Sequence, residues 1–201
     1  MALNLATLTA DLVKLLDSTS PTFVGYPSDK ASAAVNWCNT YHLYAQAATD
    51  ISLDPVVTAN LPGMINILTA QLPDAAGGTI VDAANAFDAA FVAYWTGAVF
   101  AIGTPIPPAP PPLCPNLFVP PGNGIWALEV TSLVTAVTPG VLAANLQPIF
   151  AAFTADPVSK ASDIASAFHD ATTTLVFVTI VGTDTMVVPG PQPISNMCTI
   201  I

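Results

Sequence analysis

Cys38 and His42 are the pair of side chains in this sequence best suited to catalysis. At positions i and i+4 of a helix they share one face, where a histidine can take the proton of a thiol and leave a nucleophilic thiolate. That chemistry predicts a small hydrolase whose reaction with thiol-directed reagents depends on Cys38. No basic side chain nearby is available to stabilise an oxyanion, and His42 falls outside the apolar positions of its helix. We therefore interpret the pair as a partly buried thiol beside a surface histidine.

The other polar residues form no recognisable catalytic or metal-binding pattern. His169 and Asp170 are adjacent, so on a helix their side chains point about 100° apart and do not form a catalytic dyad. The segment from Asp50 to Asp54 lacks the dense oxygen ligands and the glycine of a calcium-binding loop, and helix capping is the better explanation of Asp54. The sequence contains no GxGxxG, Walker, HExxH or GxSxG motif. It therefore predicts no catalytic, cofactor-binding or metal-binding residues.

The three cysteines, Cys38, Cys114 and Cys198, are widely spaced and form no CxxC pair. The sequence thus signals neither a zinc site nor a disulfide scaffold, and the ordinary interpretation is three reduced thiols in apolar surroundings. An odd number leaves at least one thiol free or available to another chain. Cys198, near the C-terminus, is best placed to meet a neighbour, and whether Cys198 or Cys114 forms an intermolecular disulfide stays open.

Three apolar helical patterns each begin at an Asn-Leu pair and lead to an alanine-rich helix with one large aromatic residue. Each unit is typical of an αα-hairpin, and units that bury their faces against neighbours tolerate inner loops of different lengths. The units run from Asn4-Leu5 to Trp37, from Asn60-Leu61 to Phe87, and from Asn145-Leu146 to Phe168.

The second helices of the three units can be aligned on these aromatic residues. Their apolar stripes then share the spacing i, i+1, i+4, i+7, i+8, i+11, which is one face of an α-helix. The aligned stripes are Ala33, Ala34, Trp37, Thr40, Tyr41 and Tyr44; Ala83, Ala84, Phe87, Ala90, Phe91 and Tyr94; and Ile164, Ala165, Phe168, Ala171, Thr172 and Leu175.

Residues that commonly begin helices stand where these helices are expected. Ser28 or Asp29 can cap the second helix of unit one, and Thr79 that of unit two. Asp156, followed by a proline, marks the start of the second helix of unit three. Pro148 is expected to kink or restart the first helix of that unit.

Two other segments depart from the helical pattern. Residues 104–123 hold nine prolines, which lack amide donors and favour polyproline II, so they predict a stiff strap between units two and three. The tail 184–201 predicts an apolar, extended arm of the kind that docks on a neighbouring subunit. Residues 172–181 are rich in β-branched side chains and taken alone favour a strand, but we follow the repeat and predict helix there.

The 201 residues, 53% of them apolar, suffice for a substantial core. The patterns together predict an all-α fold: three repeated αα-hairpins in one helical domain, with a proline-rich strap and an extended C-terminal arm. The expected segments are 1–103 for hairpins one and two, 104–123 for the strap, 124–183 for hairpin three and 184–201 for the arm.

The chain carries few charges: 13 acidic residues, three lysines and no arginine give a net charge of -10. A compact chain of this size exposes roughly 9,000 Å², or one charged side chain per about 560 Å², so we expect neighbouring proteins to cover much of it. Nucleic acid is excluded because phosphate neutralisation needs many Lys and Arg side chains. The uncharged runs 89–128 and 130–155 are too interrupted by proline and polar residues for a membrane span. With no secretory signal visible, we expect a subunit made in the cytoplasm.

The repeated Ala-Asn-Ala-Phe at 84–87 and Ala-Ser-Ala-Phe at 165–168 run on to Gly-Thr turns at 103–104 and 182–183. In these motifs and in composition, the chain resembles the small structural proteins of tailed-bacteriophage virions that are rich in alanine, threonine and proline and poor in lysine and arginine. Unit one departs from the pattern, with Ala-Val-Asn-Trp at 34–37. The resemblance implies a non-enzymatic virion subunit in the tail, baseplate, neck or capsid decoration. Its partners would be other virion structural proteins and copies of itself.

A second function remains open beside this one. The chain could be a helical carrier that binds an apolar small ligand between its hairpins. Such a carrier would hold the ligand among aromatic side chains of the second helices. The expected lining is Tyr41, Tyr44, Phe91, Tyr94 and Trp95.

Overall fold

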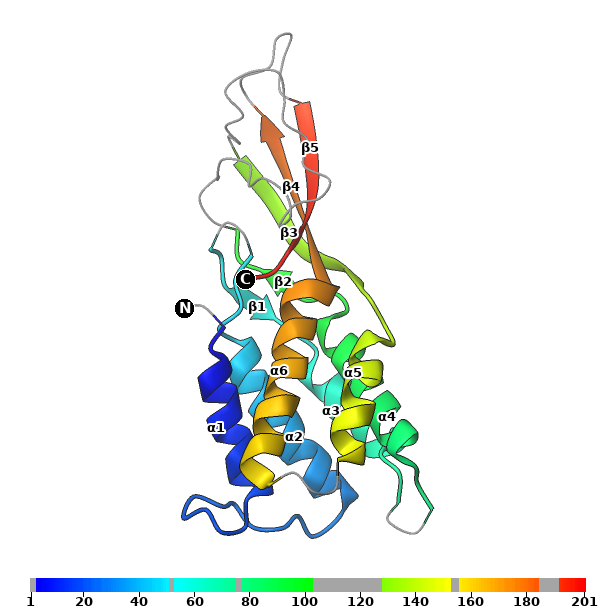
Figure 1. Ribbon diagram of the computed structural model, residues 1–201. Helices are drawn as coiled ribbons and strands as arrows, with labels where there is room; N and C mark the ends of the chain where they lie inside the picture. Colours follow the sequence, from blue (N-terminus) through cyan, green and yellow to red (C-terminus); the bar gives the residue numbers. More distant parts are fainter. Residues whose placement is uncertain (1–2, 51–52, 75–76, 103–127, 153–155, 185–191) are drawn as a thin grey trace.

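The computed structural model describes residues 3–50, 53–74, 77–102, 128–152, 156–184 and 192–201, with the backbone alone for 128–130, 182–184 and 192–196. Within these residues the chain forms six helices and five strands. The helices make up one end of an elongated molecule, and a ribbon of long strands projects from them (Figure 1). The helices are α1 (Leu5–Leu16), α2 (Lys30–Ala45), α3 (Leu61–Gln71), α4 (Ile80–Trp95), α5 (Val141–Ala151) and α6 (Pro157–Leu175). The strands are β1 (Val56–Thr58), β2 (Val99–Phe100), β3 (Leu128–Val137), β4 (Val176–Asp184) and β5 (Gln192–Thr199).

The predicted all-α class is wrong, because the strands form a five-stranded antiparallel sheet in the order β1-β2-β3-β4-β5. The long ribbon consists of β4 with β3 on one side and β5 on the other. Val134, Val178 and Cys198 lie side by side across these three strands. The short strands β1 and β2 extend the sheet beside β3 at its helical end (Figure 1).

The expectation of helix failed within unit three. α6 continues through three successive threonines, whose hydroxyls donate to backbone carbonyls one turn earlier, Thr172 to Phe168 at 2.6 Å for example. The helix ends at Leu175, and from Val176 onward the β-branched residues pair with β3 and β5. The helix predicted for 172–181 is therefore wrong after Leu175.

The six helices pair along the chain as α1 with α2, α3 with α4, and α5 with α6, although α5 begins at Val141 and not at Asn145. The first helix of each pair also contacts the second helix of another pair. α1 contacts α2 and α6, α3 contacts α4 and α2, and α5 contacts α6 and α4. The same arrangement thus recurs three times around a closed ring of helices.

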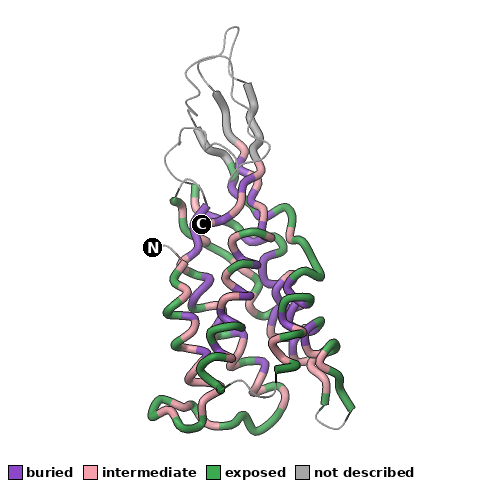
Figure 2. The backbone as a smooth tube through the Cα atoms, viewed as in Figure 1, coloured by how far each residue is buried: buried purple, intermediate pink, exposed green. Residues whose placement is uncertain are grey.

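The second helices meet at the centre of this ring through their predicted stripes. The ring centroids of Trp37 and Phe87 lie 5.1 Å apart, and those of Phe87 and Phe168 6.2 Å. Tyr41 lies 6.0 Å from Phe91 and 5.2 Å from Phe168. Buried residues accordingly run along the inside of the helical end and into the base of the ribbon (Figure 2). The aromatic residues that define the repeat therefore form one core.

The predicted helix caps Asp29, Thr79 and Asp156 are confirmed, and Asn4 and Asn60 also act as caps. The side chains of Asn4, Asp29 and Thr79 each accept a hydrogen bond from the backbone N–H three residues later. Asn60 and Asp156 do the same for α3 and α6. These contacts satisfy N–H groups that have no partner inside the helix.

The Asn145-Leu146 pair was expected to open the helical pattern of unit three, but it lies inside α5. α5 follows Gly140, whose φ of +84° suits glycine and which offers no side-chain cap. The carboxylate of Asp88 on α4 replaces that cap, accepting from the N–H of Gly140 at 2.8 Å and of Ala143 at 3.3 Å. α5 continues through Pro148 and does not restart there.

The described part of the C-terminal segment is not a separate arm, because it pairs within its own chain as a strand of the sheet. β5 pairs with β4, and Ile201 exchanges two backbone hydrogen bonds of 2.9 Å with Thr49. Cys198 is buried and disulfide-bonded whereas Cys38 is free, so the expectation of three reduced thiols is wrong. The proline-rich strap at 104–123, with Cys114, lies outside the described residues.

Candidate functional site

Cys38 and His42 both lie on α2, but they do not act as a chemical pair. Cys38 is fully buried, and burial raises the pKa of its thiol to about 12. Nδ1 of His42 lies 2.8 Å from the hydroxyl of Tyr94 on α4, and burial lowers the pKa of this imidazole. A thiol that is protonated at neutral pH and shielded from solvent is a poor nucleophile. The histidine instead joins α2 to α4.

His169 makes the corresponding contact between α2 and α6. Its Nδ1 lies 2.6 Å from the hydroxyl of Tyr44. Burial raises the pKa of Tyr44, and the negative charge of Asp170 adds to that effect. Each of the two histidines in the chain is therefore engaged with a tyrosine between helices.

A directed chain of hydrogen bonds crosses the centre of the bundle. Nε1 of Trp95 on α4 donates to the hydroxyl of Tyr41 on α2 at 2.7 Å. The hydroxyl of Thr172 on α6 donates to the carbonyl of Phe168, so its oxygen accepts the proton of Tyr41 from 2.7 Å away. Tyr41 is 3% exposed, and Trp95 and Thr172 are fully buried. The polar groups of Trp95, Tyr41 and Thr172 thus all have hydrogen-bond partners in the core, as buried polar groups require.

The space between the hairpins is filled by side chains. A cavity of about 10 Å³ remains there, bounded in part by Trp37, Tyr41 and Phe87. This volume is enough for about one water molecule, whereas pockets for small ligands measure about 300–1,000 Å³. The aromatic residues expected to line a carrier pocket pack against one another instead, with Tyr94 and Trp95 at 5.1 Å for example.

Asp50 is a fully buried carboxylate where the helical end meets the sheet. It accepts from the hydroxyl of Ser132 on β3 at 2.7 Å and from the N–H of Asp54 at 3.1 Å. The interpretation of Asp54 as a helix cap is wrong, because Asn60 caps α3 and Asp54 lies in the loop before β1. Among the described residues, no group of three or more His, Cys, Asp or Glu side chains is placed to hold a metal ion. In the same part of the chain, no helix is both long and apolar enough to cross a membrane.

An uncharged groove of about 530 Å³ lies where the start of α1 meets the end of α2. Leu43, 65% exposed, lies on its wall, and the hydroxyl of Tyr44 is already engaged with His169. Its lining combines amide, hydroxyl and aliphatic side chains and includes no charged group to orient a ligand. The lining residues are Asn4, Thr7, Leu43, Tyr44, Gln46, Ala47, Thr49 and Pro55.

One face of the long strands is both accessible and uncharged. Along β3, Ser132 and Val134 are buried, whereas Thr131, Leu133 and Thr135 are exposed on the opposite face. The half-buried side chains of β4 and β5 at matching register positions continue this face. We call it the neutral face; its residues are Thr131, Leu133 and Thr135 on β3, Phe177, Thr179 and Val181 on β4, and Met197 and Thr199 on β5.

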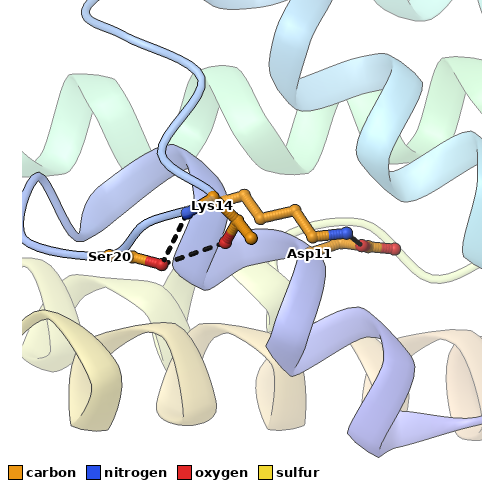
Figure 3. Close-up of polar contacts among 4 residues, drawn as sticks. Asp11, Lys14 and Ser20 are labelled. Carbon is orange, nitrogen blue, oxygen red and sulfur yellow. Dashed lines mark hydrogen bonds and ion pairs between the residues drawn. The ribbon is translucent and has the colours of Figure 1, made fainter.

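Most of the charged residues lie in the helical end, although β3 and β4 also contain Glu129 and Asp184. All three lysines lie on helices, and Lys14 reaches along α1 to form an ion pair with Asp11 (Figure 3). Lys30 lies 3.5 Å from Asp74 and donates to the carbonyl of Leu72, just after α3. Nine of the twelve aspartates belong to the helices or to the loops beside them: Asp11, Asp17, Asp29, Asp74, Asp82, Asp88, Asp156, Asp163 and Asp170.

Sequence reasoning missed the neutral face because it expected helix over this part of unit three. The available signal was the enrichment of 128–137 in β-branched residues, namely Val130, Thr131, Val134, Thr135 and Val137, which favours a strand. No protein-family model, no curated protein and no solved structure matches this chain.

Proposed function

We propose that this chain is a non-enzymatic structural subunit of a multi-copy protein assembly, and that the assembly is a virion of the tailed-bacteriophage type. The neutral face is the observation that carries the proposal, because it exposes uncharged strand residues beside a tightly packed bundle. Leu133 on this face is 38% exposed. Such a surface suits burial against protein.

The distribution of charge over the whole molecule supports the same function. The chain exposes 9694 Å² and has 16 formally charged side chains, so each charge is shared by about 600 Å². Free soluble proteins carry charge on about a quarter to a third of their surface residues. A subunit that is largely covered by neighbours does not need that solvation.

The roles of the reactive side chains also favour a structural function. Cys38 is buried with a raised pKa, and His42 and His169 each hold a tyrosine hydroxyl between helices. These are contacts that stabilise one rigid arrangement of helices. A rigid subunit is what a repeating assembly requires.

The virion setting rests on the resemblance in composition and in the short repeated motifs. We propose other virion structural proteins and copies of this chain as its partners. Two observations test whether the protein belongs to a virion. One is mass spectrometry of purified phage particles, and the other is the identity of the reading frames beside its gene. We expect peptides of this protein in purified particles and neighbouring reading frames that encode tail, sheath or baseplate proteins. Neighbouring frames that encode metabolic enzymes would contradict the proposal.

Sedimentation velocity and light scattering on the purified chain test the assembly function itself. We expect concentration-dependent association from micromolar to submillimolar protein, with binding of a hydrophobic dye that falls as association proceeds. A monomer at every concentration with little dye binding would refute the proposal.

A further inference from the structure

The neutral face is unlike the helical end in the partners it can attract. A basic protein is drawn to the aspartates of the helical end and gains nothing electrostatically from threonine, leucine and phenylalanine side chains. A partner for the neutral face must itself offer an uncharged surface. The chain supplies such a surface in a second copy of itself.

Electrostatic repulsion restricts how two copies can meet. Each copy carries a net charge of -10, most of it in the helical end, so contacts between helical ends are unfavourable. The ribbon projects from the helices, so copies that meet through their ribbons can hold their helical ends apart (Figure 1). The neutral faces themselves contain no charged residue, although Glu129 and Asp184 belong to the same strands, so contact through these faces brings uncharged side chains together.

The polar groups of the neutral face also tolerate burial. The hydroxyl oxygens of Thr135 and Thr179 lie 2.6 Å apart across β3 and β4, so each is already partnered within the chain. Burying a hydroxyl that keeps its hydrogen bond avoids most of the desolvation cost. Leu133, Phe177 and Val181 then supply apolar surface that gains from removal from water.

We infer that the neutral face packs against the neutral face of a second copy of this chain, as a twofold contact of sheet on sheet. Faces of antiparallel sheets pack in this way at a separation of about 10 Å. The inference rests on the proposed assembly function, since it names the surface and the partner through which assembly begins. In a twofold contact both copies contribute the same residues.

The test compares Leu133→Asp with the matched variant Leu43→Asp in the full-length chain. Both leucines are partly exposed, but Leu43 lies on α2 and is not a residue of the neutral face. Sedimentation equilibrium at low and high salt measures association, and circular dichroism with thermal unfolding checks that each variant folds. Leu133→Asp should raise the dissociation constant by at least about tenfold. Leu43→Asp should change it by no more than about twofold, as surface substitutions outside an interface do.

The salt dependence of association and a mixture of two charged variants test whether the partner is a second copy of the chain. Association of the unmodified chain should tighten with salt, because screening weakens the repulsion between two acidic copies. A mixture of Leu133→Asp with Leu133→Lys should associate more tightly than either variant alone, because opposite charges then face each other across the twofold contact.

The experiments distinguish failure of the neutral-face contact from failure of the proposed assembly function. If the unmodified chain associates and Leu133→Asp associates equally well, the neutral face is not the contact and the assembly function stands. Association that weakens with salt, or a mixture no tighter than its components, would also overturn the inference alone. A chain that stays monomeric in every condition would overturn both.

Discussion

Tyr41→Phe tests the hydrogen-bond chain at the centre of the bundle. The substitution keeps the ring and removes a hydroxyl that accepts from Trp95 and donates to Thr172, each at 2.7 Å. The indole N–H of the fully buried Trp95 then loses its acceptor. Thr172 keeps its own bond to the carbonyl of Phe168.

The expected cost follows from these contacts. A buried donor left without a partner costs about 1–3 kcal/mol, and a lost hydrogen bond to a neutral group about 0.5–1.5 kcal/mol. The free energy of unfolding should therefore fall by about 2–4 kcal/mol. For a chain of this length that corresponds to a decrease in Tm of about 4–16 °C.

Thermal and urea unfolding of the variant measure this loss, with Tyr26→Phe as the control. Tyr26 is 78% exposed, so its substitution should change the free energy of unfolding by less than about 0.5 kcal/mol. A double-mutant cycle with Thr172→Val should give a coupling energy of at least about 0.5 kcal/mol. If Tyr41→Phe is as stable as the unmodified chain, the hydrogen-bond chain does not contribute as described.

Three further predictions concern other buried groups. Asp88→Ala should lower the free energy of unfolding by about 2–4 kcal/mol in urea titrations, because the start of α5 loses its carboxylate acceptor. Asp88→Asn should lower it by less, and equal stability of both variants and the unmodified chain would show that Asp88 does not cap α5. Burial lowers the pKa of His42 in the folded chain, so its contribution is present above the unfolded pKa of about 6.5 and lost as pH falls through the folded pKa. The Tm should therefore fall more steeply from pH 7 to pH 5 than that of His42→Gln, and parallel curves would refute this. Because Cys198 is in a disulfide and Cys38 is buried, thiol titration without reductant should find no reactive thiol in the folded chain and one thiol after denaturation. Three reactive thiols after denaturation would show that Cys198 is not in a disulfide.

The helices could be predicted from the sequence because their signals are local. Asn4, Asp29 and Thr79 bond to amides three residues away, and a cap of this kind is visible in a short window. The apolar stripes repeat every three to four residues, so their buried faces were also recognisable. Asn145 shows the limit of this reasoning, since it matches the pattern but lies in the middle of α5.

The sheet and the neutral face depend on contacts that no short window contains. Leu133 pairs with Thr179 on β4, and β-branched residues such as Val176 become strand because β3 and β5 offer backbone partners. The contact of Asp88 with the start of α5 is equally non-local, because its partner amide at Gly140 lies 52 residues later in the chain. Both features follow from the tertiary arrangement, which propensity and periodicity do not specify.

The mass of the chain in solution, measured by sedimentation equilibrium across protein concentration at low and high salt, tests the central claim most directly. Assembly through an uncharged surface predicts a mass that rises above the 20.6 kDa of one chain as concentration increases, and rises further at high salt. A mass that stays at 20.6 kDa in every condition would contradict it.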